Sequence, residues 1–178
     1  NIAVNIALEL RSRFDRVAIA DLDIVNPYFR TKDSEAELKA AGILLISSAF
    51  AGSNVDLPAL PQEAYSITDD RTLRAVMDIG GDDRGALALG RYTPFLRAED
   101  DYEMLFVINK YRPLTRDPES AAQILHEVET AGGLPFTAIV NNSNLGEETA
   151  PEDVLASQAY ADAVTALTGL PVKMTTVK

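Results

Sequence analysis

The chain has 178 residues, 47% of them hydrophobic and 24% charged, which is enough for one domain with a substantial core. No apolar run approaches the roughly 18 residues that a membrane helix needs, and the absence of Cys excludes disulfides, thiolate nucleophiles and zinc–thiolate clusters. The net charge of −11 argues against binding that neutralises many nucleic-acid phosphates, so we expect no direct contact with nucleic acid. The absence of Cys and of a membrane helix pattern leads us to expect a cytoplasmic protein.

The first predicted element is an amphipathic helix over residues 1–14. Polar residues form one stripe along it and apolar residues occupy the opposite side, with the spacing of an α-helix. The pattern is helical from Asn1 onward. We therefore expect a helix that has already begun at the first residue.

Five short apolar runs follow, roughly 30 residues apart, and each predicts a strand buried on both faces. They are RVAIA from Arg16, ILLI from Ile43, AVMDI from Ala75, MLFVI from Met104 and FTAIV from Phe136. Helical patterns lie between most of them, which predicts an α/β fold: a doubly wound, mostly parallel sheet with helices on both faces. The longest probable loop, residues 47–61, is either a plain connector or a lid.

Two further helices and one strand are predicted toward the end of the chain. Asp117 is an N-cap candidate because Pro118 follows it, and Gly132 and Gly133 should close that helix. Thr149 and Glu152 have the spacing of a capping box, which predicts a helix running to about Gly169. The run PVKMTTV from Pro171 predicts a final strand.

Polar residues end most of the predicted strands. Ligands bind beyond the carboxyl ends of strands in an open parallel sheet, so these positions are the candidate site. They are Asp21 and Asp23; Asp78 with Gly80 and Gly81; Asn109 and Lys110; and Asn141 and Asn142. Two acids one residue apart can hold a magnesium-bound water and orient an attacking water. A single acid at a strand end often does no more than contact solvent, but three with neighbouring amides favour a site.

Four segments resemble ParA/MinD-type ATPases, which belong to the SIMIBI class of P-loop proteins. NIAVNIALEL is similar to the helix that follows the P-loop, VAIADLDIVNPYF to the second strand and switch I, VMDIGGDDRG to the Walker B strand and switch II, and AIVNN to a late strand that contacts adenine. The segments occur in the family's order. DLDIVNPYFR looks nearest to a subgroup of uncharacterised bacterial ATP-binding proteins.

The resemblance implies a role for each matched residue. Asp21 and Asp78 would belong to the magnesium shell, and Asp23 would position the hydrolytic water. Gly81 would sense the γ-phosphate through its backbone, and Asn141 would read adenine.

The segment NKYR, which begins at Asn109, only partly resembles the guanine-reading motif NKxD, because it lacks the final Asp. Asn109 and Lys110 are weaker candidates for nucleotide contact, and the resemblance favours ATP over GTP. It further implies a homodimer whose switch segments, residues 21–32 and 78–90, respond to the γ-phosphate and control an unidentified protein partner. No basic amphipathic helix for membrane attachment is visible.

One departure from the family is large. No Gly-Lys pair occurs, so the P-loop is not in this sequence. We therefore expect residues 1–178 to form a single nucleotide-hydrolase domain whose first strand and P-loop precede Asn1. The expected activity, magnesium-dependent ATP hydrolysis, depends on that P-loop.

Two alternatives remain open. DLDIV also fits the nucleophile motif of haloacid-dehalogenase-type phosphatases, with Asp21 as nucleophile and Lys110 beside the phosphate. The order of GDD and Lys110 along the chain counts against this reading. The other alternative is a non-catalytic interaction module that kept the fold.

Three other features receive less weight. His126 lies on the polar side of its predicted helix and should be a surface residue rather than a base. Ser47 and Ser48 lack a plausible His partner for serine hydrolysis. Tyr28 and Phe29 could stack on a ligand or simply pack.

Overall fold

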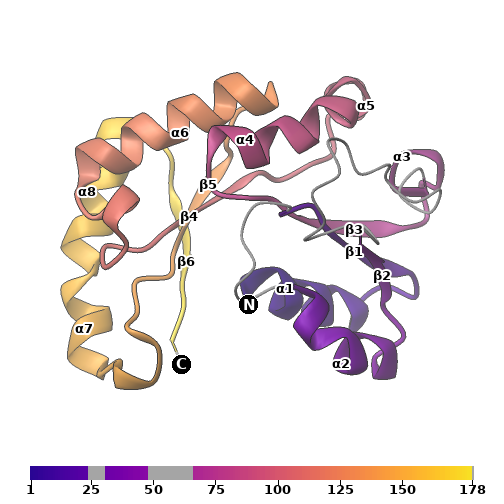
Figure 1. Ribbon diagram of the computed structural model, residues 1–178, viewed down its shortest axis with the longest axis horizontal. Coiled ribbons are helices and arrows are strands. Elements are labelled where there is room, and N and C mark those ends of the chain that lie inside the picture. Colours follow the sequence, from indigo (N-terminus) through magenta and orange to yellow (C-terminus); the bar gives the residue numbers. More distant parts are fainter. Residues whose placement is uncertain (24–30, 48–65, 178) are drawn as a thin grey trace, which may run out of the picture. The chain divides into compact units, whose positions relative to one another are not determined.

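The computed structural model describes residues 1–23, 31–47 and 66–177 of the chain. The predicted α/β class with parallel strands is confirmed, because the strands form two parallel sheets flanked by helices (Figure 1). The chain divides into two compact units, of which unit 1 comprises residues 1–80 and 87–95 and unit 2 comprises residues 81–86 and 96–178.

Unit 1 contains the first three strands. Its elements are α1 (Ile2–Arg11), β1 (Val17–Asp21), η1 (Thr31–Ser34), α2 (Glu35–Ala40), β2 (Leu44–Ser47), α3 (Ser66–Asp69), β3 (Arg74–Asp78) and η3 (Leu87–Arg91), followed by the start of α5 (Thr93–Glu99). The sheet has the order β2-β1-β3, with all pairs parallel. Every residue of β1 is buried, as the continuous apolar run predicts for a central strand.

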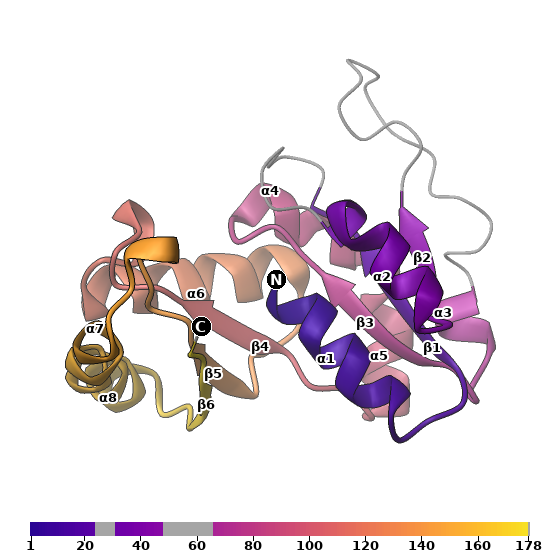
Figure 2. The same ribbon diagram turned by 90° about the horizontal axis from the view of Figure 1, so that it is seen from below.

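Helices α1 and α2 cover one face of this sheet (Figure 2). The core between them contains Val17 and Ile19 of β1, Val4 and Ala7 of α1, and Leu38 of α2. These residues are almost fully buried, and each large aliphatic side chain contributes roughly 1.5–3 kcal/mol by leaving water. Val17 and Ile19 are two residues apart and so lie on the same face of β1, which is the face that α1 covers.

Unit 2 contains the other three strands. Its elements are α4 (Asp83–Ala86), the end of α5, β4 (Leu105–Ile108), η4 (Pro113–Thr115), α6 (Pro118–Gly132), β5 (Ala138–Asn141), η5 (Gly146–Glu148), α7 (Pro151–Ala156), α8 (Gln158–Thr168) and β6 (Val172–Thr175). The sheet order is β4-β5-β6, again parallel throughout. Phe106 and Ile139 of this sheet share a core with Leu125 of α6 and Val164 of α8.

The predicted ends of α6 are confirmed. Asp117 caps the helix by accepting a hydrogen bond from the backbone N–H of Ser120 at 2.8 Å, and Pro118 is the first helical residue. The Ser120 N–H and hydroxyl together lower the pKa of Asp117. Gly133 ends the helix with φ of 70°, a left-handed conformation that costs glycine little.

The single helix predicted from Thr149 to Gly169 is instead two helices, α7 and α8. The capping-box prediction was also wrong, because Ala150 is the N-cap and Asp153 accepts from the Ala150 N–H at 2.9 Å. Thr149 instead donates its hydroxyl to Gly146 O at 2.7 Å. Ser157 lies between the two helices, and its hydroxyl oxygen accepts a hydrogen bond from Asn141. No described helix is long and apolar enough to cross a membrane.

Candidate functional site

Two carboxylates share one edge of the unit 1 sheet. Asp21 and Asp78 are the last residues of β1 and β3, and they lie opposite each other in the parallel register. The Leu22 N–H donates to the Asp78 carbonyl oxygen at 2.9 Å, which extends the ladder beyond the strand ends. Asp21 is buried and Asp78 is half-buried. The structure therefore brings these two predicted metal ligands to neighbouring strand ends.

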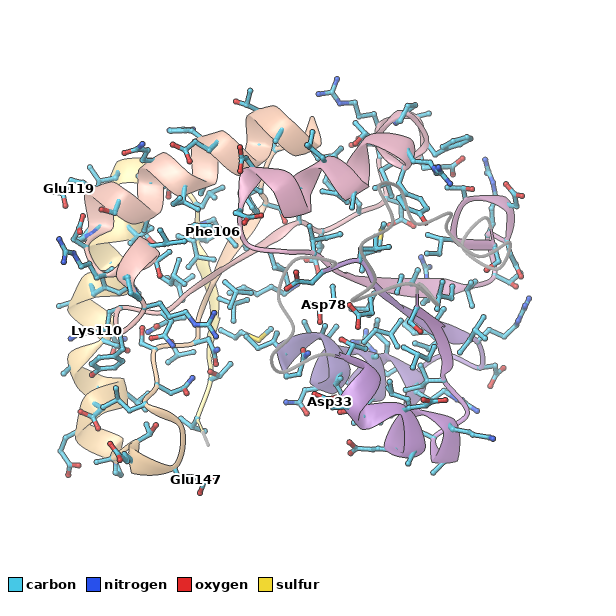
Figure 3. The ribbon with its side chains drawn as sticks, in the orientation of Figure 1. Asp33, Asp78, Phe106, Lys110, Glu119 and Glu147 are labelled. Carbon is cyan, nitrogen blue, oxygen red and sulfur yellow. The ribbon has the colours of Figure 1, made fainter. Side chains whose placement is uncertain are left out.

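Asp78 is held by donors from two other elements. The Thr31 hydroxyl donates to Asp78 Oδ2 at 2.6 Å, and Asn1 Nδ2 donates to the same oxygen at 3.1 Å. Asn1 Nδ2 also lies 3.4 Å from the Thr31 hydroxyl oxygen. Asp78 is labelled in Figure 3, at the end of β3. The network joins the start of α1, the start of η1 and the end of β3.

The N-terminus of α1 lies at this acidic edge. Asn1 caps the helix, because its Oδ1 accepts from the Ala3 N–H at 2.9 Å while its Nδ2 reaches Asp78. The first residue of the described chain therefore links α1 to the acid at the end of β3.

The donor set fits a magnesium ion held together with a ligand phosphate. Carboxylate and hydroxyl oxygens are hard ligands, and Mg²⁺ in proteins often uses only one or two carboxylates, with water and phosphate completing its shell. No cluster of three or more His, Cys, Asp or Glu suited to a metal is found among the described residues. Asp21 and Asp78 are thus enough for this kind of magnesium site, but not for an all-protein metal cage.

The remaining candidates from the two predicted switch segments are only partly described. Asp23 lies two residues beyond the end of β1 and is half-buried. Tyr28 and Phe29, with most of the first switch segment, lie outside the described residues, as does most of the loop predicted at 47–61. Gly81 is exposed at the start of unit 2. Nearby, Asp82 Oδ1 accepts from the Gly85 N–H at 2.7 Å and so has a local role at α4.

Asn141 is fully buried at the end of β5. Its Nδ2 donates to the Ser157 hydroxyl oxygen at 2.8 Å, and its Oδ1 accepts from the Ser143 N–H at 3.2 Å. Ser157, the residue between α7 and α8, in turn donates its hydroxyl to Val154 O at 2.7 Å. Both ends of the Asn141 amide are thus engaged within unit 2. Direct reading of a base by Asn141 would require these bonds to be exchanged.

Asn109, at the end of β4, belongs to the same network. Its Nδ2 donates to Asn144 O at 3.3 Å, and its Oδ1 accepts from the Tyr111 N–H at 3.0 Å. The Lys110 N–H donates to the Ser143 hydroxyl oxygen at 3.1 Å, so the loops after β4 and β5 are joined. The Lys110 side chain, labelled in Figure 3, places its Nζ 5.4 Å from the centre of the Tyr111 ring.

Sequence reasoning missed three of these residues. Asn1 is a favoured N-cap residue type, and that signal could have identified the cap. Thr31 and Ser157 carry no such signal, because their partners lie 47 and 16 residues away in the sequence. His126, by contrast, was correctly predicted as a surface residue, and its side chain is 71% exposed.

Comparison with solved structures relates the chain to known proteins by fold. No family model and no curated protein sequence matches the chain. The crystal structure of FtsY from Mycoplasma mycoides matches with a TM-score of 0.61 and 17% sequence identity, covering 99% of this chain and 54% of the FtsY chain. The chain thus spans about half the length of this neighbour. The match shows that the chain has an α/β fold of the P-loop NTPase type.

Proposed function

We propose that this chain is the main part of a magnesium-dependent ATPase of the ParA/MinD-like switch type. One observation carries the proposal: Asp21 and Asp78 end neighbouring parallel strands and lie opposite each other in the register. Two carboxylates at one sheet edge support a magnesium ion that accompanies a phosphate group. The P-loop type of fold is consistent with this use of the edge.

Each residue of the proposed site has a separate role. Asp21 and Asp78 would hold magnesium-bound waters, and Asp23 would orient the water that attacks the γ-phosphate. Magnesium bound with the triphosphate would neutralise the negative charge on the phosphoryl oxygens. Gly81 senses the γ-phosphate through its backbone N–H.

The base-binding region lies at the carboxyl ends of β4 and β5. Asn141 and Asn109 support it chiefly by holding the loops after these strands, since their amides bond to those loops. We propose ATP as the nucleotide because the segment NKYR, which begins at Asn109, lacks the final Asp that reads guanine in the motif NKxD.

The proposal includes a missing part and a partner. We propose that a P-loop and its strand complete the same nucleotide-hydrolase domain. We further propose a cytoplasmic homodimer whose switch segments control a protein partner through the γ-phosphate.

Titration of the full-length protein with ATP, in Mg²⁺ and in EDTA, tests the proposal. We expect saturable ATP binding that Mg²⁺ strengthens, slow release of inorganic phosphate, and weaker competition by GTP than by ATP. Hydrolysis of a small phosphomonoester is measured in parallel and should not be detected.

Two outcomes would contradict the proposal in different ways. Failure of the full-length protein to bind any nucleoside triphosphate would favour a non-catalytic module. Turnover of the phosphomonoester through a phosphorylated Asp21 would instead favour the haloacid-dehalogenase type of reaction.

A further inference from the structure

Thr31 is a buried hydroxyl with an ionic partner. Its residue is 0% exposed, and its 2.6 Å bond to Asp78 Oδ2 is as short as hydroxyl–carboxylate bonds usually are when the acceptor is charged. Such a bond is stronger away from water, and its Thr31 end is buried. Thr31 therefore restrains the direction in which the Asp78 carboxylate points.

The restraint leaves one carboxylate oxygen available. Both hydrogen bonds to the Asp78 side chain end on Oδ2, and within the part of the chain that the structure describes none ends on Oδ1. A carboxylate accepts hydrogen bonds but donates none, so Oδ1 requires a cation or a water as its partner. The orientation set by Thr31 thus decides where that partner is held.

We propose that Thr31 is a positioning residue for the divalent cation: its hydroxyl fixes the Asp78 carboxylate and thereby sets the magnesium affinity of the nucleotide complex. The proposal rests on the proposed ATPase function and adds a residue to it. Thr31 itself contacts neither metal nor nucleotide in this scheme. Residues that orient a metal-binding group typically change metal affinity about 10- to 100-fold when they are replaced.

The choice of variants follows from the buried geometry. Thr31→Val keeps the shape of the side chain and removes the hydroxyl, whereas Thr31→Ser keeps the hydroxyl and removes a methyl group. The two variants therefore separate loss of the hydrogen bond from loss of packing. Thr31→Ala, which cannot overfill the site, replaces Thr31→Val if the latter does not fold.

The experiment measures binding of a fluorescent ATP analogue to the full-length protein as Mg²⁺ is varied, and again in EDTA. For Thr31→Val we expect the Mg²⁺ concentration for half-maximal binding to rise about 10-fold or more, with affinity in EDTA unchanged. Thr31→Ser should remain within about twofold of the wild type, because the donor is kept. Thermal unfolding of each variant confirms that it is folded.

A second background tests whether the effect passes through Asp78. In Asp78→Asn, which has no carboxylate to orient, adding Thr31→Val should produce no further shift in the Mg²⁺ requirement. An equal loss of affinity in Mg²⁺ and in EDTA, or a full shift in the Asp78→Asn background, would overturn the role of Thr31. A wild type that binds no nucleotide at all would remove the proposed function, and this role with it.

Discussion

The two sheets of this protein end in different kinds of polar residue. Acids suit metal binding, whereas amides suit hydrogen bonds that hold loops together. In unit 1 the carboxyl ends of β1 and β3 carry the acids Asp21 and Asp78. In unit 2 the ends of β4 and β5 lead into amides, of which Asn141 is completely buried. Both edges are candidate sites by topology alone, because parallel strands place their carboxyl ends together.

The hydrogen-bonding capacity of the two residue types explains the difference. An amide both donates and accepts, so neighbouring Asn and Ser residues can satisfy one another, as Asn141 does with Ser157 and Ser143. An ionised carboxylate only accepts, so two acids at one edge require donors or a cation. The acidic edge is therefore suited to a metal, whereas the amide edge forms a closed framework.

Asp23→Ala offers the largest expected effect and tests whether the acidic edge does chemistry. We expect ATP hydrolysis by the full-length protein to fall roughly 10²- to 10⁴-fold, the usual contribution of a group that positions a reacting water or proton. ATP binding should remain, since Asp23 is assigned to the water and not to the nucleotide. Phosphate release and ATP affinity are measured on the same preparation.

Asp33→Ala is the matched control for this prediction. Asp33 is also an acid of unit 1, but it is exposed in the first turn of η1 (Figure 3). Its removal should leave hydrolysis close to the wild-type rate. Similar losses in both variants would mean that general acidity, rather than the position of Asp23, matters.

The parts of this comparison that follow local rules were predictable. Apolar runs located β1 to β5. The predicted burial on both faces holds for β1 and β5, whereas β2, β3 and β4 are only partly buried. Asp117 and Gly133 marked α6, because caps depend on a few adjacent residues.

Features that depend on tertiary partners were not predictable. The break at Ser157 is stabilised by Asn141 from another element, and Thr31 meets Asp78 only after the sheet has formed. The same limit applies to the amide edge. Asn141 was expected to read adenine, and no local sequence pattern indicates that its amide is engaged inside unit 2.

Asn141→Leu tests whether the amide edge is a framework. The change leaves the Ser143 N–H without its acceptor and removes the donor to the Ser157 hydroxyl oxygen, and a buried unsatisfied polar group costs about 1–3 kcal/mol. We expect a loss of about 2 kcal/mol or more in the free energy of unfolding, measured by urea denaturation.

Ser157→Ala makes this second prediction specific to one bond. If Asn141 and Ser157 act as a pair, the double variant should lose less stability than the sum of the single variants. Additive losses would show that the two residues contribute independently. Unchanged stability of Asn141→Leu, combined with a selective loss of ATP affinity, would favour direct base reading by Asn141 instead.

Tyr160→Phe has the smallest expected effect and probes the support beneath the amide edge. The Tyr160 hydroxyl of α8 donates to the Thr115 carbonyl oxygen of η4, and removing one such bond typically costs about 1 kcal/mol. Burial raises the pKa of Tyr160 to about 12, because the phenolate loses hydration, and the negative charge of Asp117 adds to this effect. A raised pKa means that the folded state retains its proton longer than the unfolded state, whose tyrosine has a pKa near 10.

The stabilisation that Tyr160 provides is therefore complete below about pH 10 and declines as the pH rises from about 10 through about 12. Urea denaturation of wild type and variant across this range should show their stability difference shrinking with pH, while other titrating groups cancel in the comparison. A difference that stays constant up to pH 12 would mean that Tyr160 titrates like an ordinary tyrosine and gives no protonation-linked support to unit 2.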